Sequence, residues 1–134
     1  MKYLTGYISS RSILNNHIPQ KVQNILLRSY CDQISHGYLM GAAEYQMSTC
    51  YAVLRSEVDR LMSSDEFHSG IVCYSINMLP DLELSAYYFK RMISAHKSFH
   101  FFLEDIIVSD PDSMRDALEL LTLIRVYSSN YSFR

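Results

Sequence analysis

The chain has 134 residues, of which 49% are hydrophobic and 19% charged, with a formal net charge of −2. This composition indicates one globular domain over residues 1–134 and excludes a disordered chain. The acidic balance argues against a dedicated nucleic-acid binder, whose surface is usually basic. Three cysteines form no CxxC pair, and no apolar run approaches the roughly 20 residues of a membrane helix. We therefore expect a cytoplasmic protein without a signal peptide or membrane segment.

The first half of the chain predicts two strands and two helices. Residues 3–9 have the aromatic and β-branched character of a strand, and a polar loop follows over 9–17. Pro19 suits the first turn of a helix, and Gly37 suits a left-handed cap at its end. The expected apolar face of this helix comprises Val22, Ile25, Leu26, Tyr30 and Ile34. A strand over 38–43 ends at Glu44, and a second helix is expected to begin near Ser48 or Thr49.

The second half predicts two more strands and two more helices. Residues 70–75, GIVCYS, have the continuous apolar character of a strand covered on both faces. Pro80 and Asp81 open a third helix, and residues 99–103 form a fourth strand. Asp110 and Pro111 mark the start of an apolar helix over about 111–128. This last helix is more apolar than a solvated surface helix, so it either crosses the sheet or forms a dimer contact, and we expect a homodimer through it.

The alternation of strands and helices predicts an α/β fold with three layers. Each segment between strands is long enough for a crossover connection, so the sheet is expected to be mostly parallel. We expect about four strands with helices on both faces.

Polar residues that follow each expected strand predict a functional site. Ligands of open parallel sheets bind outside the carboxyl ends of the strands. The candidate residues at these ends are Ser9, Ser10, Arg11, Glu44, Tyr45, Cys50, Tyr74, Ser75, Asn77, Glu104 and Asp105. Each one also has a structural interpretation as a turn, cap or surface residue.

Three of these residues are candidate catalytic groups. Arg11 can hold a phosphate or carboxylate, and Glu44 can act as a general base or bind sugar hydroxyls, or form a salt bridge with Arg11. Cys50 lies near an expected helix N-terminus, where a thiolate is favoured, although a small buried cysteine is the commoner case. The five histidines and the cysteines show no metal-ligand spacing, and there is no glycine-rich phosphate loop. We expect no metal and no organic cofactor.

The segments GYISSR, PQKVQN and RSYC, followed by Glu44 and GIVCYSINMLPD, resemble the N-terminal catalytic domain of serine recombinases, the resolvase/invertase family. The resemblance implies a resolvase-like sheet and a C-terminal helix used for dimerisation. Ser9 stands at the family's arginine position and Arg11 at its serine position, or Ser10 becomes the serine with a one-residue gap. Met78 and Asp81 stand where two catalytic arginines belong. Without those arginines the charge on a phosphodiester loses its main support, so DNA recombination is not expected.

A second pattern resembles the sporadic carbohydrate cluster protein family, small proteins encoded in bacterial carbohydrate-biosynthesis clusters. It comprises GYISSR, PQxVQN, EYxMxxCY over 44–51, YSxxMLP over 74–80 and HFxLE over 100–104. The resemblance implies a role in lipopolysaccharide or capsule biosynthesis. It does not identify the reaction.

Three functions follow from these patterns. The first is an enzyme acting on a sugar or sugar-nucleotide intermediate. Arg11, Glu44 and Cys50 would be its catalytic residues, and Ser9, Ser10, Gln20, Tyr45, Tyr74 and Ser75 would bind the substrate. The second is a non-catalytic dimeric binding or scaffold protein of the same pathway. The third, and least favoured, is a degenerate resolvase-like domain that binds DNA.

Overall fold

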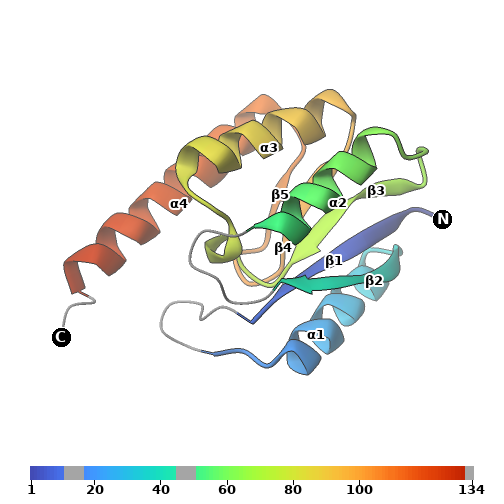
Figure 1. The fold of residues 1–134 in the computed structure, drawn as a ribbon, viewed down its shortest axis with the longest axis horizontal. Coiled ribbons are helices and arrows are strands. Elements are labelled where there is room, and N and C mark those ends of the chain that lie inside the picture. Colours follow the sequence, from blue (N-terminus) through green and yellow to red (C-terminus); the bar gives the residue numbers. More distant parts are fainter. Residues whose placement is uncertain (11–16, 45–50, 132–134) are drawn as a thin grey trace.

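The computed structural model describes residues 1–10, 17–44 and 51–131, the last four of these by their backbone. Strands and helices alternate along most of the chain (Figure 1). In chain order the elements are β1 (Tyr3–Ser9), α1 (Gln20–Gln33), β2 (Gly37–Glu44), α2 (Ala52–Met62), β3 (His68–Cys73), the 3-10 turn η1 (Ile76–Met78), α3 (Leu82–Ser94), β4 (Ser98–Phe101), β5 (Ile106–Val108) and α4 (Pro111–Tyr131).

One sheet has the strand order β2-β1-β3-β4-β5. The first four strands are parallel, as the long crossovers predict, and β5 runs antiparallel to β4. The prediction of about four strands missed β5, because its three residues follow β4 after a short turn and carry no alternating pattern. The α/β fold with a mostly parallel sheet is confirmed.

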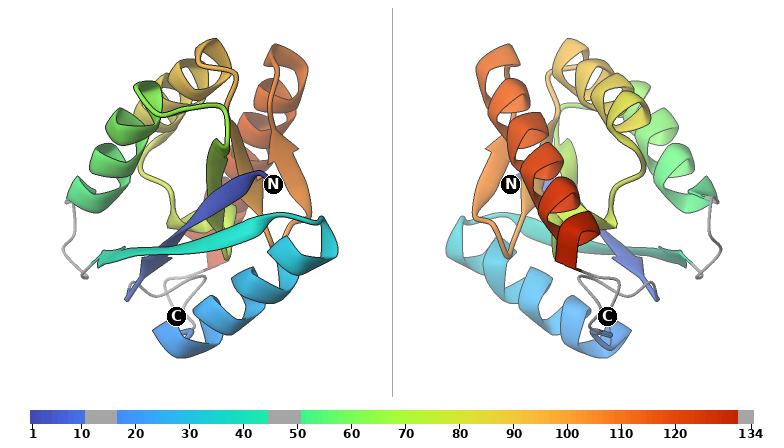
Figure 2. Two further views of the ribbon diagram at one scale, coloured as in Figure 1. Left: turned by 90° about the vertical axis from the view of Figure 1, so that its right-hand side faces the viewer. Right: turned by 90° about the vertical axis from the view of Figure 1, so that its left-hand side faces the viewer.

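Two hydrophobic clusters cover the two faces of the sheet. On one face, α1 packs Leu27, Tyr30 and Cys31 against Leu4, Ile8 and Val72. On the other face, α2 and α3 cover a larger cluster that contains Tyr7, Ile71, Cys73, Phe99 and Phe101. Figure 2 shows α1 on the opposite side of the sheet from α2 and α3. The three-layer arrangement with helices on both faces is therefore confirmed.

The helix α4 lies beside α3 and against β5 and η1. Ala117 and Leu121 on its inner side are fully buried in the larger cluster. On its outer side, Leu123 is 66%, Val126 55% and Tyr127 66% exposed. The helix is thus buried on one side only, and its C-terminal half presents apolar residues outward.

The prediction for α1 was wrong in two respects. Val22 and Ile25 are exposed, whereas Gln23 is fully buried. The face of the helix that is buried against the sheet therefore differs from the predicted apolar face. A count of apolar residues cannot recognise a buried glutamine that finds hydrogen-bond partners in the backbone of another segment. Gly37 is also not the cap: Ser35 has the left-handed φ of 60°, and Gly37 begins β2.

The other differences concern element boundaries. β3 ends at Cys73, so Tyr74 and Ser75 follow the strand, and β4 ends at Phe101 instead of Leu103. The described part of α2 begins at Ala52 after Tyr51, and the expected start at Ser48 or Thr49 lies outside the described residues. α4 continues to Tyr131, about one turn beyond its predicted end.

Candidate functional site at the carboxyl edge of the sheet

Glu44 ends the edge strand β2 with its side chain turned inward, only 3% exposed. Its Oε1 accepts hydrogen bonds from the Tyr7 hydroxyl at 2.8 Å and from the Leu54 amide at 3.3 Å. Its Oε2 accepts one from the Val53 amide at 3.1 Å. These amides belong to the first turn of α2, where an acceptor and a negative charge are both favourable. Glu44 therefore caps α2 from a distant strand, and both of its oxygens are engaged.

Gln23 of α1 lies in the PQxVQN segment, but it was not among the predicted site residues. Its Nε2 donates to the carbonyl oxygens of Ser9 at 2.9 Å and Ile18 at 2.8 Å, and its Oε1 accepts from the Ser9 amide at 3.4 Å. One buried amide side chain thus holds the end of β1 against the start of α1. The available signal was a polar residue inside a helix that otherwise turns apolar side chains inward.

The two serines after β1 have different environments. Ser9 is fully buried, whereas Ser10 is partly exposed. The Ser10 amide donates to the Glu44 carbonyl at 3.0 Å, and its hydroxyl lies 3.5 Å from the same oxygen. Of the two, Ser10 is the residue with a hydroxyl at the surface of this edge.

Ser75 and Glu104 join the end of β3 to the turn after β4. The Ser75 hydroxyl donates to Glu104 Oε2 at 2.7 Å, and the Ile76 amide donates to Oε1 at 2.9 Å. Ser75 also accepts from the Asn77 amide at 3.1 Å and so caps η1. The Ser75 side chain is fully buried. These bonds give Ser75 and Glu104 a structural role at the end of the strands.

An aromatic pair lies beside these polar groups. The rings of Tyr74 and Phe102 are stacked, with centroids 5.9 Å apart and an interplanar angle of 29°. Tyr30 meets Phe102 edge-on at 6.4 Å. Tyr74 and Phe102 are half-buried, so part of their surface remains accessible at the carboxyl end of β3. Partly exposed aromatic rings of this kind can pack against a sugar ring or a base.

The predicted site residues are only partly brought together. Tyr7 of β1 pairs in register with Cys73 of β3, so Ser9 and Ser75 each lie two residues beyond the same point of the sheet. Glu44 pairs in register with Ser9 and accepts hydrogen bonds from Tyr7 and Ser10, so it belongs to the same edge of the sheet. The residues Arg11, Tyr45 and Cys50 lie outside the described residues, and their roles stay predictions.

Gln20, a predicted binding residue, is the first residue of α1 and is half-buried. It lines a groove of about 620 Å³ along α1 and β2, together with Lys21, Asn24, Ile25, Arg28, Ser29, Asp32 and Met40. The structure therefore associates Gln20 with this groove, whereas Tyr74 and Ser75 belong to the end of β3. Its predicted role as a ligand-binding residue stays a prediction.

Cys31 and Cys73 are buried and free of disulfides, in agreement with their predicted place in the core. Burial, with a smaller contribution from Asp32, raises the pKa of Cys31 to about 11. Burial also raises the pKa of Cys73, and Glu104 adds to the effect. Neither thiol is ionised at neutral pH, so neither is a nucleophile.

The two positions that correspond to catalytic arginines of the serine recombinases, in the resemblance described above, carry no guanidinium group. Met78 is 1% exposed in the larger hydrophobic cluster. Asp81 caps α3, where its Oδ1 accepts from the Leu84 amide at 2.8 Å. Both side chains serve the fold, and neither supplies the positive charge that a phosphoryl-transfer transition state requires.

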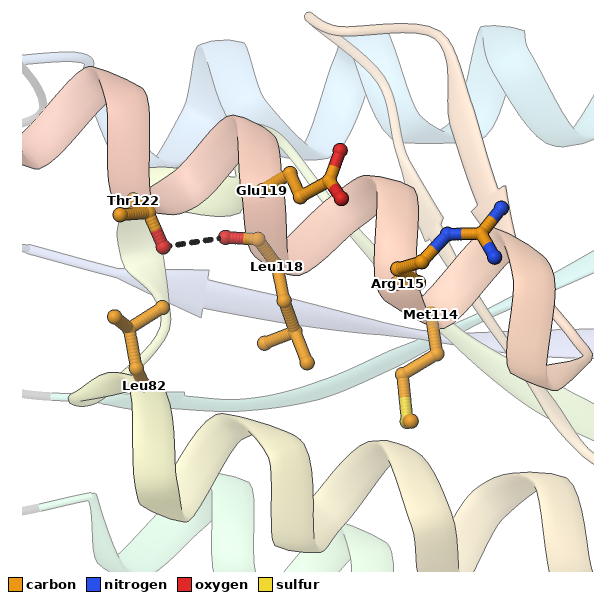
Figure 3. Close-up of a pocket in the computed structure, with 6 residues that line it drawn as sticks. All are labelled: Leu82, Met114, Arg115, Leu118, Glu119 and Thr122. Carbon is orange, nitrogen blue, oxygen red and sulfur yellow. Dashed lines mark hydrogen bonds between the residues drawn. The ribbon is translucent and has the colours of Figure 1, made fainter.

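A second hollow, of about 370 Å³, lies between α3 and α4 (Figure 3). The side chains of Leu82, Met114 and Leu118 point into the space between the two helices, whereas Arg115 points away from it.

Within residues 1–10, 17–44 and 51–131, no helix has both the length and the apolar character to cross a membrane.

No family model matches the sequence, and a search of curated proteins finds no match. Among solved structures, the chain is similar to the N-terminal catalytic domain of TP901-1 integrase, with a TM-score of 0.71. The two share 12% sequence identity, and the match covers 98% of this chain and all of the other. At this identity the likeness concerns the fold, and it confirms the resolvase-like architecture.

Proposed function

We propose that this chain is a non-catalytic binding and scaffold protein of bacterial surface-carbohydrate biosynthesis, located in the cytoplasm. Its fold is resolvase-like, and the polar residues at the carboxyl edge of the sheet mostly stabilise that fold. The observation that carries the non-catalytic part is the capping of α2 by Glu44. A general base needs a lone pair that the substrate can reach. This carboxylate is 3% exposed, and the Tyr7 hydroxyl and the Val53 and Leu54 amides occupy most of its roughly four acceptor positions.

The other buried groups support the same interpretation. The Ser75 hydroxyl donates to Glu104 and is fully buried, so it offers no accessible nucleophile. Met78 and Asp81 lack the positive charge needed for strand exchange, which argues against a recombinase reaction. An enzyme would have to rely on Arg11 and Cys50, and substitution of Cys50 distinguishes the two hypotheses.

The proposed ligand is a sugar or sugar nucleotide. The carbohydrate setting comes from the sequence pattern that GYISSR, EYxMxxCY and YSxxMLP share with the sporadic carbohydrate cluster family. The half-buried ring pair of Tyr74 and Phe102 supports it, because aromatic faces pack well against sugar rings. In this proposal Ser10 and Tyr74 contact the sugar, and Arg11 holds an anionic group of the ligand.

The proposal includes a homodimer through α4. Leu123, Val126 and Tyr127 follow the i, i+3, i+4 spacing of one helix face and are each more than half exposed. Clusters of exposed apolar residues of this kind mark contact surfaces. A second α4 that covers them would remove three large side chains from water in each protomer.

The test uses a strain with a measurable surface glycan from which the gene is deleted. Complementation with the wild-type chain should restore the glycan, and the Cys50→Ser and Glu44→Gln chains should restore it too if they accumulate normally. Arg11→Ala should reduce it, because ligand binding is weakened. Loss of the glycan with Cys50→Ser at normal protein levels would support the enzyme instead. An unchanged glycan in the deletion strain would refute the carbohydrate role.

Ligand binding is tested separately with the purified protein and UDP-glucose in saturation-transfer NMR. Tyr74→Ala should weaken the signal at least fivefold. Tyr87→Ala is the matched control, because Tyr87 is a tyrosine of α3 that is 54% exposed and is not among the residues proposed to contact the sugar. An equal loss in both variants would contradict a specific role for Tyr74.

A further inference from the structure

The strand β2 forms one end of the sheet, and no described residue pairs with its outer edge. From Gly37 to Ala43 the strand has no charged residue and no proline. Its first four residues keep a regular register with Tyr3–Gly6 of β1, and the register shift lies further along. Proteins usually protect a free edge with charges, prolines or bulges throughout, since its open N–H and C=O groups pair readily with another strand. Half of β2 has no such protection.

The groove beside this edge is lined by both apolar and basic side chains. Met40 of β2 is 61% and Ile25 of α1 58% exposed, and both line the groove. Lys21 and Arg28 also line it, and within the described residues neither forms an ion pair. The Arg28 guanidinium lies over the Tyr38 ring at 5.6 Å, which holds it against β2. Asp32 is the one acidic residue that lines this groove.

We propose that this edge takes an extended, acidic segment of a partner protein, which adds as a sixth strand beside β2. Main-chain hydrogen bonds to β2 would provide affinity that does not depend on the sequence of the segment, as in other cases of strand addition. Apolar side chains of the segment would cover Met40 and Ile25, and its carboxylates would meet Lys21 and Arg28. The proposal deepens the scaffold role, on which it rests, by naming the surface and the chemistry of the partner.

The spacing of the two cations fits such a segment. Arg28 follows Lys21 by seven positions, which is about 10 Å along a helix. Side chains on one face of a strand repeat about every 6.6 Å, so carboxylates two or four positions apart can reach both cations. Charge complementarity therefore favours a strand with alternating acidic residues.

A second copy of this chain fits the edge less well. Its own β2 has no carboxylate between Gly37 and Ala43 to meet Lys21 and Arg28. An antiparallel pair of β2 strands would instead bring two sets of these cations together, which is unfavourable. The occupant that the charges select is therefore a different protein.

The experiment measures binding of a labelled peptide, Val-Glu-Val-Glu-Val-Glu-Val, by fluorescence anisotropy and hydrogen exchange. We expect binding in the micromolar to millimolar range, slower exchange of β2 amides, and at least fivefold weaker binding of Lys21→Glu and Arg28→Glu. The matched control is Arg115→Glu, a charge reversal at an exposed site on α4 with 63% exposure, which should bind as the wild type does. A peptide with lysine in place of glutamate should bind at least fivefold more weakly.

Three results would overturn the inference. The first is equal binding of the glutamate and lysine peptides. The second is peptide binding without slower hydrogen exchange of the β2 amides, which would indicate an electrostatic contact without strand pairing. The third is self-association of the protein that Met40→Lys abolishes, which would assign the edge to a second copy. None of these depends on the glycan phenotype, so failure here is distinguishable from failure of the carbohydrate role.

Discussion

The fully buried Tyr7 of β1, the strand next to the edge strand β2, donates a 2.8 Å hydrogen bond from its hydroxyl to Glu44 Oε1 at the end of β2. The same carboxylate accepts two amides of α2. One pair of side chains thus connects the core of the sheet, its edge strand and a helix terminus. Its position in this network gives the Glu44 side chain a structural role.

Substitution of Glu44 tests this structural role. Glu44→Ala removes the carboxylate that accepts from the Tyr7 hydroxyl and from the Val53 and Leu54 amides, so we expect the free energy of unfolding to fall by about 2–3 kcal/mol. Tyr7→Phe should cost about 1 kcal/mol, and the double variant should lose less than the sum. Urea denaturation measures all three. Glu119→Ala, an exposed position, is the control, and additivity of the two changes would contradict the direct coupling.

His100 gives the protein a predictable dependence on pH. It is 6% exposed, its Nδ1 lies 2.7 Å from the Tyr30 hydroxyl, and its Nε2 lies 3.0 Å from the Ser98 hydroxyl. Burial, with a further contribution from His36, lowers the pKa of His100 from 6.5 to about 4. Between these two values the unfolded chain binds a proton that the folded chain does not bind.

Stability should therefore be complete above pH 6.5 and fall as the pH decreases toward 4, by about 3 kcal/mol in total from this group. Denaturation at pH 7 and pH 4.5 measures the loss. His100→Gln should reduce the difference between the two pH values, whereas His17→Gln, at an exposed position, should leave it unchanged. The same pH dependence in His100→Gln as in the wild type would assign the effect to other groups.

Gly70 permits the close approach of β3 and β4. It pairs in register with Ser98, and a Cβ atom at this position would collide with the Ser98 carbonyl oxygen. Because that oxygen belongs to the backbone of the neighbouring strand, the strands would have to separate. We expect Gly70→Ala to lower the free energy of unfolding by more than about 2 kcal/mol. Ser56→Ala on the exposed side of α2 should change it by less than about 0.5 kcal/mol.

Arg125 fastens α4 to the segment before α3. Its guanidinium donates to the carbonyl oxygens of Leu79 at 2.6 Å and Pro80 at 2.7 Å, and burial lowers its pKa. Arg125→Met should remove both bonds and accelerate amide exchange in the C-terminal half of α4, which hydrogen-exchange mass spectrometry can measure. Arg115→Met, at the exposed side of the same helix, should leave the exchange unchanged.

The outer face of α4 predicts the oligomeric state. Leu123→Glu with Val126→Glu should convert the proposed dimer to a monomer in sedimentation experiments, since each charge would be buried in the interface. Both residues are more than half exposed, so the change should leave the fold of the monomer intact. A wild-type chain that sediments as a monomer at 100 µM would contradict the proposed dimer.

The order of strands and helices and the polar character of the strand ends could be predicted from the sequence. These features depend on local periodicity and on where apolar runs stop, and both are visible along the chain. Cys31 and Cys73 could be placed in the core for the same reason. The short antiparallel strand β5 could not be predicted, because its three residues are a strand only through their pairing with β4.

The tertiary structure alone decided what the polar residues do. The sequence offered Glu44 as a candidate base, and its role as a helix cap became visible only once Tyr7, Val53 and Leu54 were placed around it. Its catalytic role stays a prediction. The structural role of Gln23 was not predicted, because its partners, Ser9 and Ile18, belong to other segments. Apolar burial leaves a pattern in neighbouring residues, but a buried hydrogen bond is made between residues distant in the chain, so only the folded structure reveals it.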